Sequence, residues 1–521
     1  MTIEAVWFLI VGALMVIMAL GRKIVERLPM TGAMVYLIVG FLLGPACLGL
    51  LKMDVKSDLT LLRTLTEGGL VVSLFAVGMS LRIKPSNPLW RLTLRLGGPA
   101  MLLTIAIMFV AGRWGLGLAA GPALLLASAL APTDPVLANE LRVEEAGDDE
   151  PLRFALSSEG GINDGAASPL AYIALALCGV ESLGSDNPWT FTLAIAWGIA
   201  SAFIIGWALG TGVVILVTWL RTRYDHALGL EGFLALGLMG LAYGATLIVD
   251  GYAFIAVFIA GVALRRQEMK ATGERPPSET LASVERGQRE EAATDPELAH
   301  AYVAEKMLGF SEEIERFVEL GLMVIIGSVI SAHWRDLLDW SAIWPVLFLF
   351  VVARPIGSTL SLVGSSLDQM QRCLSGWLGL RGVGSFYYLL FALEKAGSGI
   401  VGPLMPIILA AIVLSVFLHG TTATVLMDRY KRCGKRNGTK LARRSATKEA
   451  MMSEQHKPGE KVQTSGIYKV VKEGDGGSGF EVTCVEGEHF PPTRSGKGAH
   501  YELGHAATHS HKHNELGSGD K

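Results

Sequence analysis

Long apolar stretches separated by short polar connections run from residue 4 to residue 427, and the rest of the chain contains no comparable stretch. A transmembrane helix needs about 20 mainly apolar residues, because each residue rises about 1.5 Å and the hydrocarbon core is about 30 Å thick. About thirteen stretches meet or approach this length, at 4–20, 32–51, 62–81, 93–112, 117–138, 153–178, 190–219, 228–249, 251–264, 312–331, 341–364, 375–394 and 398–427. The ninth is short and follows the eighth across Asp250 and Gly251, so counts of twelve and fourteen stay open. The pattern predicts an all-α polytopic membrane protein with about 13 transmembrane helices.

Lys and Arg residues gather in alternate connections between these stretches. They follow the first, third, fifth, seventh and ninth stretches, for example at Arg22, Lys23, Arg27, Arg82, Lys84, Arg142, Arg221, Arg223, Arg265 and Arg266. Positively charged connections stay in the cytoplasm, so we expect the N-terminus outside and the C-terminus inside. The expected location is the cell membrane, which for a bacterial protein is the inner membrane. The charged sequence GRKIVER follows the first stretch in place of a small-residue cleavage site, so we expect this stretch to be retained.

The organisation of the chain follows from its polar segments. Residues 1–428 are expected to form a transmembrane domain, and residues 265–310 within it are rich in both charge signs and lack an apolar face. We expect these residues to be a cytoplasmic linker between two membrane halves. Such a division is typical of transporters built from inverted repeats.

Residues 429–521 form a hydrophilic tail that we expect in the cytoplasm. Its initial Lys/Arg-rich run could bind anionic lipid headgroups or only follow the positive-inside rule, which we favour. Alternating runs such as YKVV and FEVTCV could form a small β module. The end carries His505, His509, His511 and His513, for which a metal-sensing role is the alternative to the flexible end that we expect.

Composition narrows the classes of function. Of 521 residues, 51% are hydrophobic and only 18% are charged, below the roughly 25% that is typical of soluble proteins. The net charge of -3 argues against a nucleic-acid partner. The five cysteines form no CxxC pair, which argues against a disulfide-stabilised fold. Nothing resembles a P-loop or a catalytic triad, so we expect a protein that is not an enzyme and needs no cofactor.

The fifth stretch carries an aspartate between two prolines. Pro132 and Pro135 flank Thr133 and Asp134, and each proline removes a backbone donor and disturbs the helix. Irregular backbone at membrane depth is tolerated where it lines a cavity, and its carbonyl groups are suited to binding a cation. The alternative is a simple proline kink near the cytoplasmic end, with Asp134 in water.

The sixth stretch, FALSSEGGINDGAASPLAYIALAL, contains two acids in an otherwise apolar helix. Glu159 and Asn163 are four residues apart and share a face, while Asp164 lies about 100° round the helix. A charge at mid-bilayer costs at least about 2.5 kcal/mol, so each acid indicates a function. In a cavity without water, a proton and a hard cation such as Na⁺ would compete for one carboxylate. A polar seam that only joins helices is the alternative.

Two arginines lie within apolar stretches of the second half. Arg354, in FLFVVARPIGSTL, needs a buried partner, and we expect Glu159 to form this structural pair. Arg381 and Gly382 lie in WLGLRGVGSFYYLLF, whose glycines indicate a second helix interruption. The alternative for Arg381 is a cation that extends to water from a helix end.

These residues belong to motifs that resemble the monovalent cation:proton antiporter family, which contains the NhaP-type and NHE-type sodium/proton exchangers. The motifs are LFAVGMSLR at 74–82, APTDPVLA at 131–138, SEGGINDGAASP at 158–169, ARPIG at 353–357, WLGLRG at 377–382 and SVFLHGTTATVL at 415–426. The resemblance implies thirteen helices in an inverted-repeat antiporter fold, with a six-helix core, a dimerisation domain and two unwound crossing helices. A homodimer in a lipid bilayer is implied as well.

The resemblance also implies roles for single residues. Asp164 would bind the cation and the proton, and the preceding Asn163 is typical of the electroneutral branch. Thr133 would offer an oxygen and Asp134 would support the crossover. Glu159 and Arg354 would form the core salt bridge.

We therefore expect a secondary active antiporter that exchanges a monovalent cation, Na⁺ first and K⁺ or Li⁺ next, for H⁺ in pH and sodium homeostasis. A K⁺/H⁺ antiporter is the nearest alternative. A cation channel, or a membrane sensor whose tail signals, is the alternative from a different class.

Overall fold

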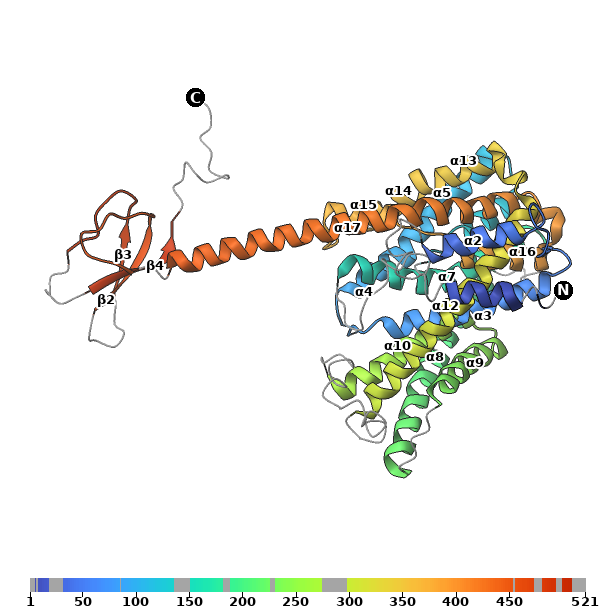
Figure 1. Cartoon of the computed structure of the whole chain (residues 1–521), viewed down its shortest axis with the longest axis horizontal. Helices are drawn as coiled ribbons and strands as arrows, with labels where there is room; N and C mark the ends of the chain where they lie inside the picture. The colour runs from blue at the N-terminus through green and yellow to red at the C-terminus, as the bar shows by residue number, and fades with distance from the viewer. Residues whose placement is uncertain are drawn as a thin grey trace. The chain divides into compact units, whose positions relative to one another are not determined.

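The computed structural model describes residues 5, 8–17, 31–84, 86–134, 150–180, 188–224, 230–273, 298–452, 455–472, 480–492 and 499–507. The chain divides into two units, Met1–Met427 and Asp428–Lys521. The first unit is helical and the second contains a small β-sheet (Figure 1).

Helices make up the first unit in its described part, and the last of them, α17, continues beyond its end at Met427 (Figure 1). They are α2 Gly32–Leu43, α3 Leu59–Ser80, α4 Leu89–Arg95, α5 Met101–Val110, α6 Ala120–Ala129, α7 Pro151–Leu177, α8 Pro188–Tyr224, α9 Glu231–Ile248, α10 Ala253–Thr272, α12 Ala299–His333, α13 Trp340–Phe348, α14 Arg354–Ser361, α15 Gln369–Trp377, α16 Val383–Val401 and α17 Met405–Met452. Among the described residues, 6 helical segments are long and apolar enough to cross a membrane, at 59–80, 89–115, 192–221, 231–248, 340–361 and 405–432. This confirms a mainly helical membrane protein, while the count of about 13 crossings stays a prediction.

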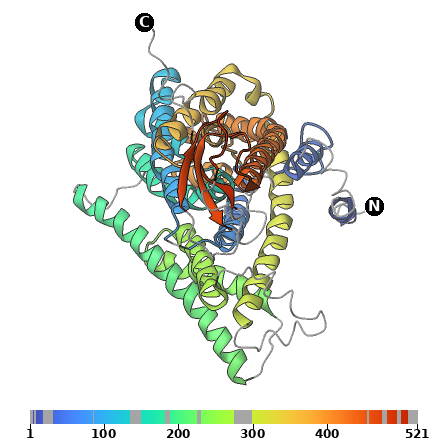
Figure 2. The same cartoon turned by 90° about the vertical axis from the view of Figure 1, so that its left-hand side faces the viewer.

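Close contacts between helix backbones hold this unit together. The helices α2 and α12 cross where Gly40 faces Gly327, and a Cβ atom on Gly327 would lie 2.8 Å from the Phe41 amide nitrogen and 2.9 Å from the Gly40 Cα. Small residues permit such crossings in lipid, where van der Waals packing between helices replaces the hydrophobic effect. The long helix α8 lies along one side of the unit and packs against α10, which also packs against α3 (Figure 2).

Non-helical backbone occurs within two of the apolar stretches. Helix α6 ends at Ala129, and residues 131–134, the last ones described before residue 150, are not helical. Residues 378–382 are not helical either, and they separate α15 from α16. The first break follows from Pro132, which supplies no amide donor, and the second lies among the glycines of LGLRG. Pro135 lies outside the described residues.

Helices cover both ends of the range 265–310 that was predicted to be a polar linker. Helix α10 extends to Thr272 and α12 begins at Ala299, so only residues 274–297 remain, and they lie outside the described residues. Arg265 and Glu268 are fully buried, and Arg82 from the end of α3 binds Glu268 with 3.0 Å between Nε and Oε2. Arg265 and Glu268 are therefore paired inside the protein. They were predicted to lie in a solvated linker because the sequence around them is rich in charged residues.

The structure decides one helix boundary that the hydropathy pattern left open and corrects another. The short ninth stretch is a separate helix, α10, because the chain turns at Asp250, which has a positive φ of 57°. Helix α17 continues to Met452, well beyond the predicted end of the last stretch at 427. The added segment is rich in Lys, Arg and Ala, which favour helix without being apolar enough to register as a membrane stretch.

The second unit contains a four-stranded antiparallel sheet in the order β1-β4-β2-β3. The strands are β1 Gln455–His456, β2 Gly466–Lys472, β3 Glu481–Cys484 and β4 Ala499–Ala506. Tyr468, Phe490 and Tyr501 form its core together with Cys484, and burial raises the pKa of the Cys484 thiol. His505 is exposed on β4, whereas the other three tail histidines of the predicted end lie outside the described residues. No group of three metal-binding side chains occurs among the residues that the structure describes.

The crossing of α2 and α12 leads to a stability prediction. We expect Gly327→Ala to destabilise the protein by about 1–3 kcal/mol, because a methyl group there overlaps the backbone of α2. Gly321→Ala on the same helix is the matched control, since nothing lies within 4 Å of its added Cβ. The measurement is the thermal unfolding midpoint of the purified protein in detergent. Equal midpoints for the two variants would contradict the close approach.

Candidate functional site

Glu159 and Arg354 form a buried ion pair between α7 and α14. Arg354 Nη1 lies 2.5 Å from Glu159 Oε1, and Nη2 lies 2.7 Å from Oε2, so the pair is bidentate. Arg354 Nη2 also donates to the Ser375 carbonyl of α15, at 3.2 Å. A π-helical segment, Leu349–Ala353, leads directly into Arg354. The pair therefore connects three helices and has little exposure to solvent.

The two non-helical segments meet at Asp134. The Asp134 amide donates to the Leu380 carbonyl at 2.9 Å, and the Val383 amide donates to Asp134 Oδ2 at 3.2 Å. Val383 is the first residue of α16, so the Asp134 carboxylate lies at the positive end of that helix. Asp134 thus stabilises the contact between the segments. Gly382, which precedes α16 as its N-cap, lies in the second of these segments.

Arg381 lies at the C-terminal ends of two helices, whereas Asp134 lies at an N-terminal end. Its Nε donates to the Leu130 carbonyl at 2.5 Å and its Nη1 to the Gly379 carbonyl at 2.6 Å. Leu130 follows the last residue of α6, and Gly379 lies just after α15, so the guanidinium neutralises the negative ends of two helices. The backbone amide of Arg381 donates to Ser415 Oγ of α17 at 2.6 Å. Arg381 is 0% exposed, which rules out a side chain that extends to water.

Asn163 and Thr133 bind each other across α7 and the first non-helical segment. Asn163 Nδ2 donates to Thr133 Oγ1 at 2.7 Å, and the Thr133 amide donates to Asn163 Oδ1 at 3.3 Å. Both residues are buried. Because both ends of the amide are engaged, Asn163 positions the non-helical segment against α7.

Asp164 is next to this contact and differs from its neighbours. Its Oδ1 atom is buried and has no hydrogen-bond partner among the described residues. The backbone of Asp164 is fixed, since the Tyr388 hydroxyl donates to its carbonyl and also bonds to Ser168 Oγ at 2.9 Å. Gly384 faces the carboxylate closely, and a Cβ there would lie 2.8 Å from Oδ1. A buried carboxylate oxygen without a donor calls for a cation or a proton.

A cavity of about 30 Å³ borders the Asp164 carboxylate. The cavity has room for roughly two water-sized particles. Its polar lining consists of Ser73, Asp134, Asp164, Glu315 and Glu319. Carboxylate and hydroxyl oxygens are the ligands that hard cations prefer, so this cavity is suited to a small monovalent cation.

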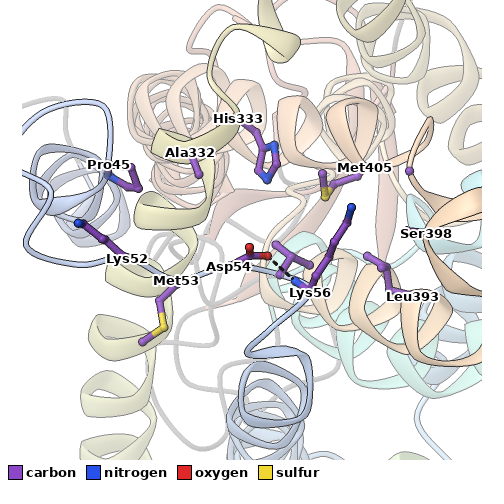
Figure 3. A pocket seen from close by; sticks show the side chains of 12 residues that line it. Pro45, Lys52, Met53, Asp54, Lys56, Ala332, His333, Leu393, Ser398 and Met405 are labelled. Carbon is purple, nitrogen blue, oxygen red and sulfur yellow. Dashed lines mark hydrogen bonds between the residues drawn. The ribbon is translucent and has the colours of Figure 1, made fainter.

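A larger cavity of about 350 Å³ lies elsewhere in the first unit (Figure 3). Lys52 and Lys56 reach it from the connection between α2 and α3, and His333 reaches it from the end of α12. Asp54 also lines it, but its Oδ1 accepts a hydrogen bond from the Lys56 amide at 2.7 Å. Two lysine ammonium groups repel cations. The smaller cavity at Asp164 is therefore the better candidate for a cation.

Sequence reasoning missed several residues of this site. Tyr388 and Gly384 were hidden in an apolar run, and no periodicity distinguishes them from packing residues. Glu315 lies near the start of the tenth predicted stretch, 312–331, where the other charges of EEIERFVEL surround it in the sequence. The signal that was available is its position one helical turn before Glu319, which places both acids on one face of a helix.

Comparisons with known proteins show which proteins this sequence resembles. Residues 10–429 match the family described as sodium/hydrogen exchanger, transmembrane, which confirms the resemblance drawn from the motifs. The K⁺/H⁺ antiporter NhaP of Alkalimonas amylolytica is 25% identical over 396 residues, which are 74% of this chain and 60% of that protein. The Na⁺/H⁺ antiporter 2 of Zygosaccharomyces rouxii is 30% identical over 254 residues, 46% of this chain and 30% of that protein. The chain thus spans less than two thirds of the length of either relative.

Solved structures share the fold. Two structures of the sodium proton antiporter MjNhaP1 from Methanocaldococcus jannaschii superpose on this chain with TM-scores of 0.55 and 0.60. Both are 19% identical to it, and they cover 79% and 82% of this chain and 98% of their own. At this identity the likeness concerns the fold, and it supports an integral, multi-pass membrane protein.

The buried ion pair generates a stability prediction. Glu159→Gln should destabilise the protein by about 3–5 kcal/mol, because it leaves the Arg354 charge buried without its counter-ion. Glu394→Gln is the matched control. Its ion pair with Arg63, 3.0 Å long, is partly exposed, and we expect a loss of less than about 1 kcal/mol. Thermal unfolding midpoints in detergent provide the measurement, and a control variant as unstable as Glu159→Gln would contradict the central role of the buried pair.

Proposed function

The chain belongs to the transmembrane sodium/hydrogen exchanger family, and from this membership we propose that it is a secondary active antiporter that exchanges a monovalent cation, Na⁺ first, for H⁺. The observation that carries the proposal is the buried Oδ1 of Asp164, which borders a cavity lined by oxygen atoms and has no hydrogen-bond partner among the described residues. Such an atom is left for the transported ions.

Exchange follows from competition for one carboxylate. Loss of water disfavours the ionised form of a carboxylate, whereas a bound cation favours it. A proton and a cation therefore exclude each other at Asp164. If the site opens to one side of the membrane at a time, the chain releases one ion before it takes up the other. The proton gradient then drives cation movement, which would serve pH and sodium homeostasis.

The neighbouring residues support this site in distinct ways. We propose Asn163, Thr133 and Asp134 as members of the ion- and proton-binding site. Their contacts with one another and with the second non-helical segment favour a positioning role, with Thr133 offering an oxygen nearby. The Glu159–Arg354 pair would hold α7 in a fixed position against α14.

The exchange is proposed to be electroneutral. Asn163 is uncharged, so Asp164 is the acid of the Asn-Asp pair at this place in α7. One carboxylate exchanges one proton for one monovalent cation, so the proton-loaded and the cation-loaded forms would carry equal charge across the membrane.

Finer features of the fold are part of the same proposal. Residues 131–134 and 378–382, including Arg381 and Gly382, would be the unwound centres of two crossing helices in an inverted-repeat fold of 13 transmembrane helices. The chain would form a homodimer in a lipid bilayer, in the bacterial inner membrane. Its N-terminus would lie outside, and the tail 429–521 in the cytoplasm.

A K⁺/H⁺ antiporter is the second candidate. The observation that favours it is the name of the relative from Alkalimonas amylolytica, a K⁺/H⁺ antiporter that aligns over 396 residues. A channel or sensor is less consistent with a small cavity that contains a buried, unpartnered carboxylate oxygen.

The first test is exchange in proteoliposomes that carry a pH dye. Adding Na⁺ should dissipate an imposed acid-inside gradient, and parallel additions of K⁺ and Li⁺ decide between the two candidates. Asp164→Asn should abolish the signal because it cannot bind a proton, while Asp164→Glu should keep part of it. Full exchange by Asp164→Asn would refute the assignment of the site.

The second test concerns stoichiometry. With the membrane potential clamped at different values by K⁺ and valinomycin, the initial Na⁺-driven exchange rate should stay nearly constant. A rate that changes steeply with voltage would show net charge movement, because one elementary charge gains about 2.3 kcal/mol per 100 mV. That outcome would rule out one-for-one exchange while leaving antiport itself intact.

A further inference from the structure

We propose that Glu315 of α12 is a second carboxylate of the cation path, which binds the entering cation in the cavity that Asp164 also lines. The inference rests on the antiport function proposed above and adds a residue that the sequence did not indicate. Glu315 lies 151 positions beyond Asp164 in the chain and belongs to none of the motifs that carry the family resemblance.

The lining of the cavity comes from several elements. Asp134, Asp164 and Gly384 belong to the first non-helical segment, α7 and α16. Helices α3 and α12 also line it, and on α12 Glu315 and Glu319 are one turn apart. A cation that occupies the cavity therefore borders carboxylates from α12 as well as the one from α7.

The position of Glu315 is set by close helix packing. Gly69 of α3 lies against α12, and a Cβ there would lie 2.5 Å from Leu322 Cδ1 and 2.9 Å from Val318 Cγ1. These residues line the same cavity, so α3 and α12 are in contact beside the two glutamates. Glu315 is only 3% exposed, and it borders the cavity from the middle of a 35-residue helix.

The electrostatics of this arrangement favour a cation. Two carboxylates that share a small volume of low dielectric repel each other strongly when both are ionised, and a proton or a cation between them removes the cost. The Asp164 Oδ1 atom, buried and without a hydrogen-bond partner in the described part of the chain, points independently to such a ligand. Glu315 raises the local concentration of cations and supplies oxygen atoms as the ion loses its water.

A packing role for Glu315 makes a different prediction. If its side chain only fills space and stabilises α12, its replacement lowers stability and the amount of active protein. The maximal exchange rate then falls, and the dependence of the rate on cation concentration does not change.

The test uses the full chain in proteoliposomes and measures initial exchange rates over a range of Na⁺ concentrations. Glu315→Gln should raise the apparent KM for Na⁺ about tenfold and change the maximal rate less than about twofold. Glu315→Asp, which keeps the charge on a shorter side chain, should give a KM between those of the wild type and Glu315→Gln. Glu313→Gln is the matched control, because Glu313 is exposed on the same helix and does not line the cavity. It should behave as the wild type.

Two results would overturn the inference. One is an unchanged KM in Glu315→Gln with a reduced maximal rate, and the other is an equal KM change in Glu313→Gln. If the wild type shows no exchange, the proposed function fails. Binding of radiolabelled Na⁺ to the purified protein then tests the role of Glu315. The variant Glu315→Gln must bind Na⁺ more weakly than the control Glu313→Gln. If Glu315→Gln does not fold, Glu315→Asp must still raise KM above that of the control.

Discussion

Every backbone group freed by a broken helix inside an apolar protein needs a new partner, and this constraint dominates the site. An unsatisfied amide or carbonyl group away from water costs several kcal/mol. Asp134 meets the need at the start of α16 and Arg381 meets it at the ends of α6 and α15. The two charges are of opposite sign, as the helix ends that they neutralise require. The non-helical segments are stable because these two side chains bind across them.

This arrangement divides the polar residues into those that hold the backbone and one that remains available. Asn163 is engaged with Thr133, and Glu159 with Arg354. Asp164 is held through its own carbonyl, which leaves its carboxylate facing the cavity. In the proposed exchange, a small cation would replace a proton at this carboxylate rather than a structural contact, so the hydrogen bonds around it would not need to break.

Close packing of helices also fixes the part of α12 that lines the cavity. Gly327 lets α12 approach α2, and Gly69 lets α12 approach α3, so the central turns of α12 have little freedom. The position of Glu315 at the cavity is fixed by this packing. The large number of glycines in the chain, 61 in all, therefore has a consequence for function as well as for packing.

Local sequence determined the apolar helices, the proline-flanked Asp134 and the acids of α7, because hydropathy and helix-breaking residues act over a few neighbours. The family resemblance followed from those same short motifs. Only the tertiary structure decided which backbone groups the buried charges bind. Val383 and Asp134 are 249 residues apart, and Arg381 and Leu130 are 251 apart. The pair of Glu159 with Arg354 could be expected from two charges in apolar stretches, but its bidentate geometry and the contact with Ser375 could not. The buried partners of Arg82 and the cavity-lining position of Glu315 were hidden for the same reason. Whether a charge is solvated, paired or available to an ion depends on distant segments of the chain. The sequence near the residue does not show which distant segments pack against it.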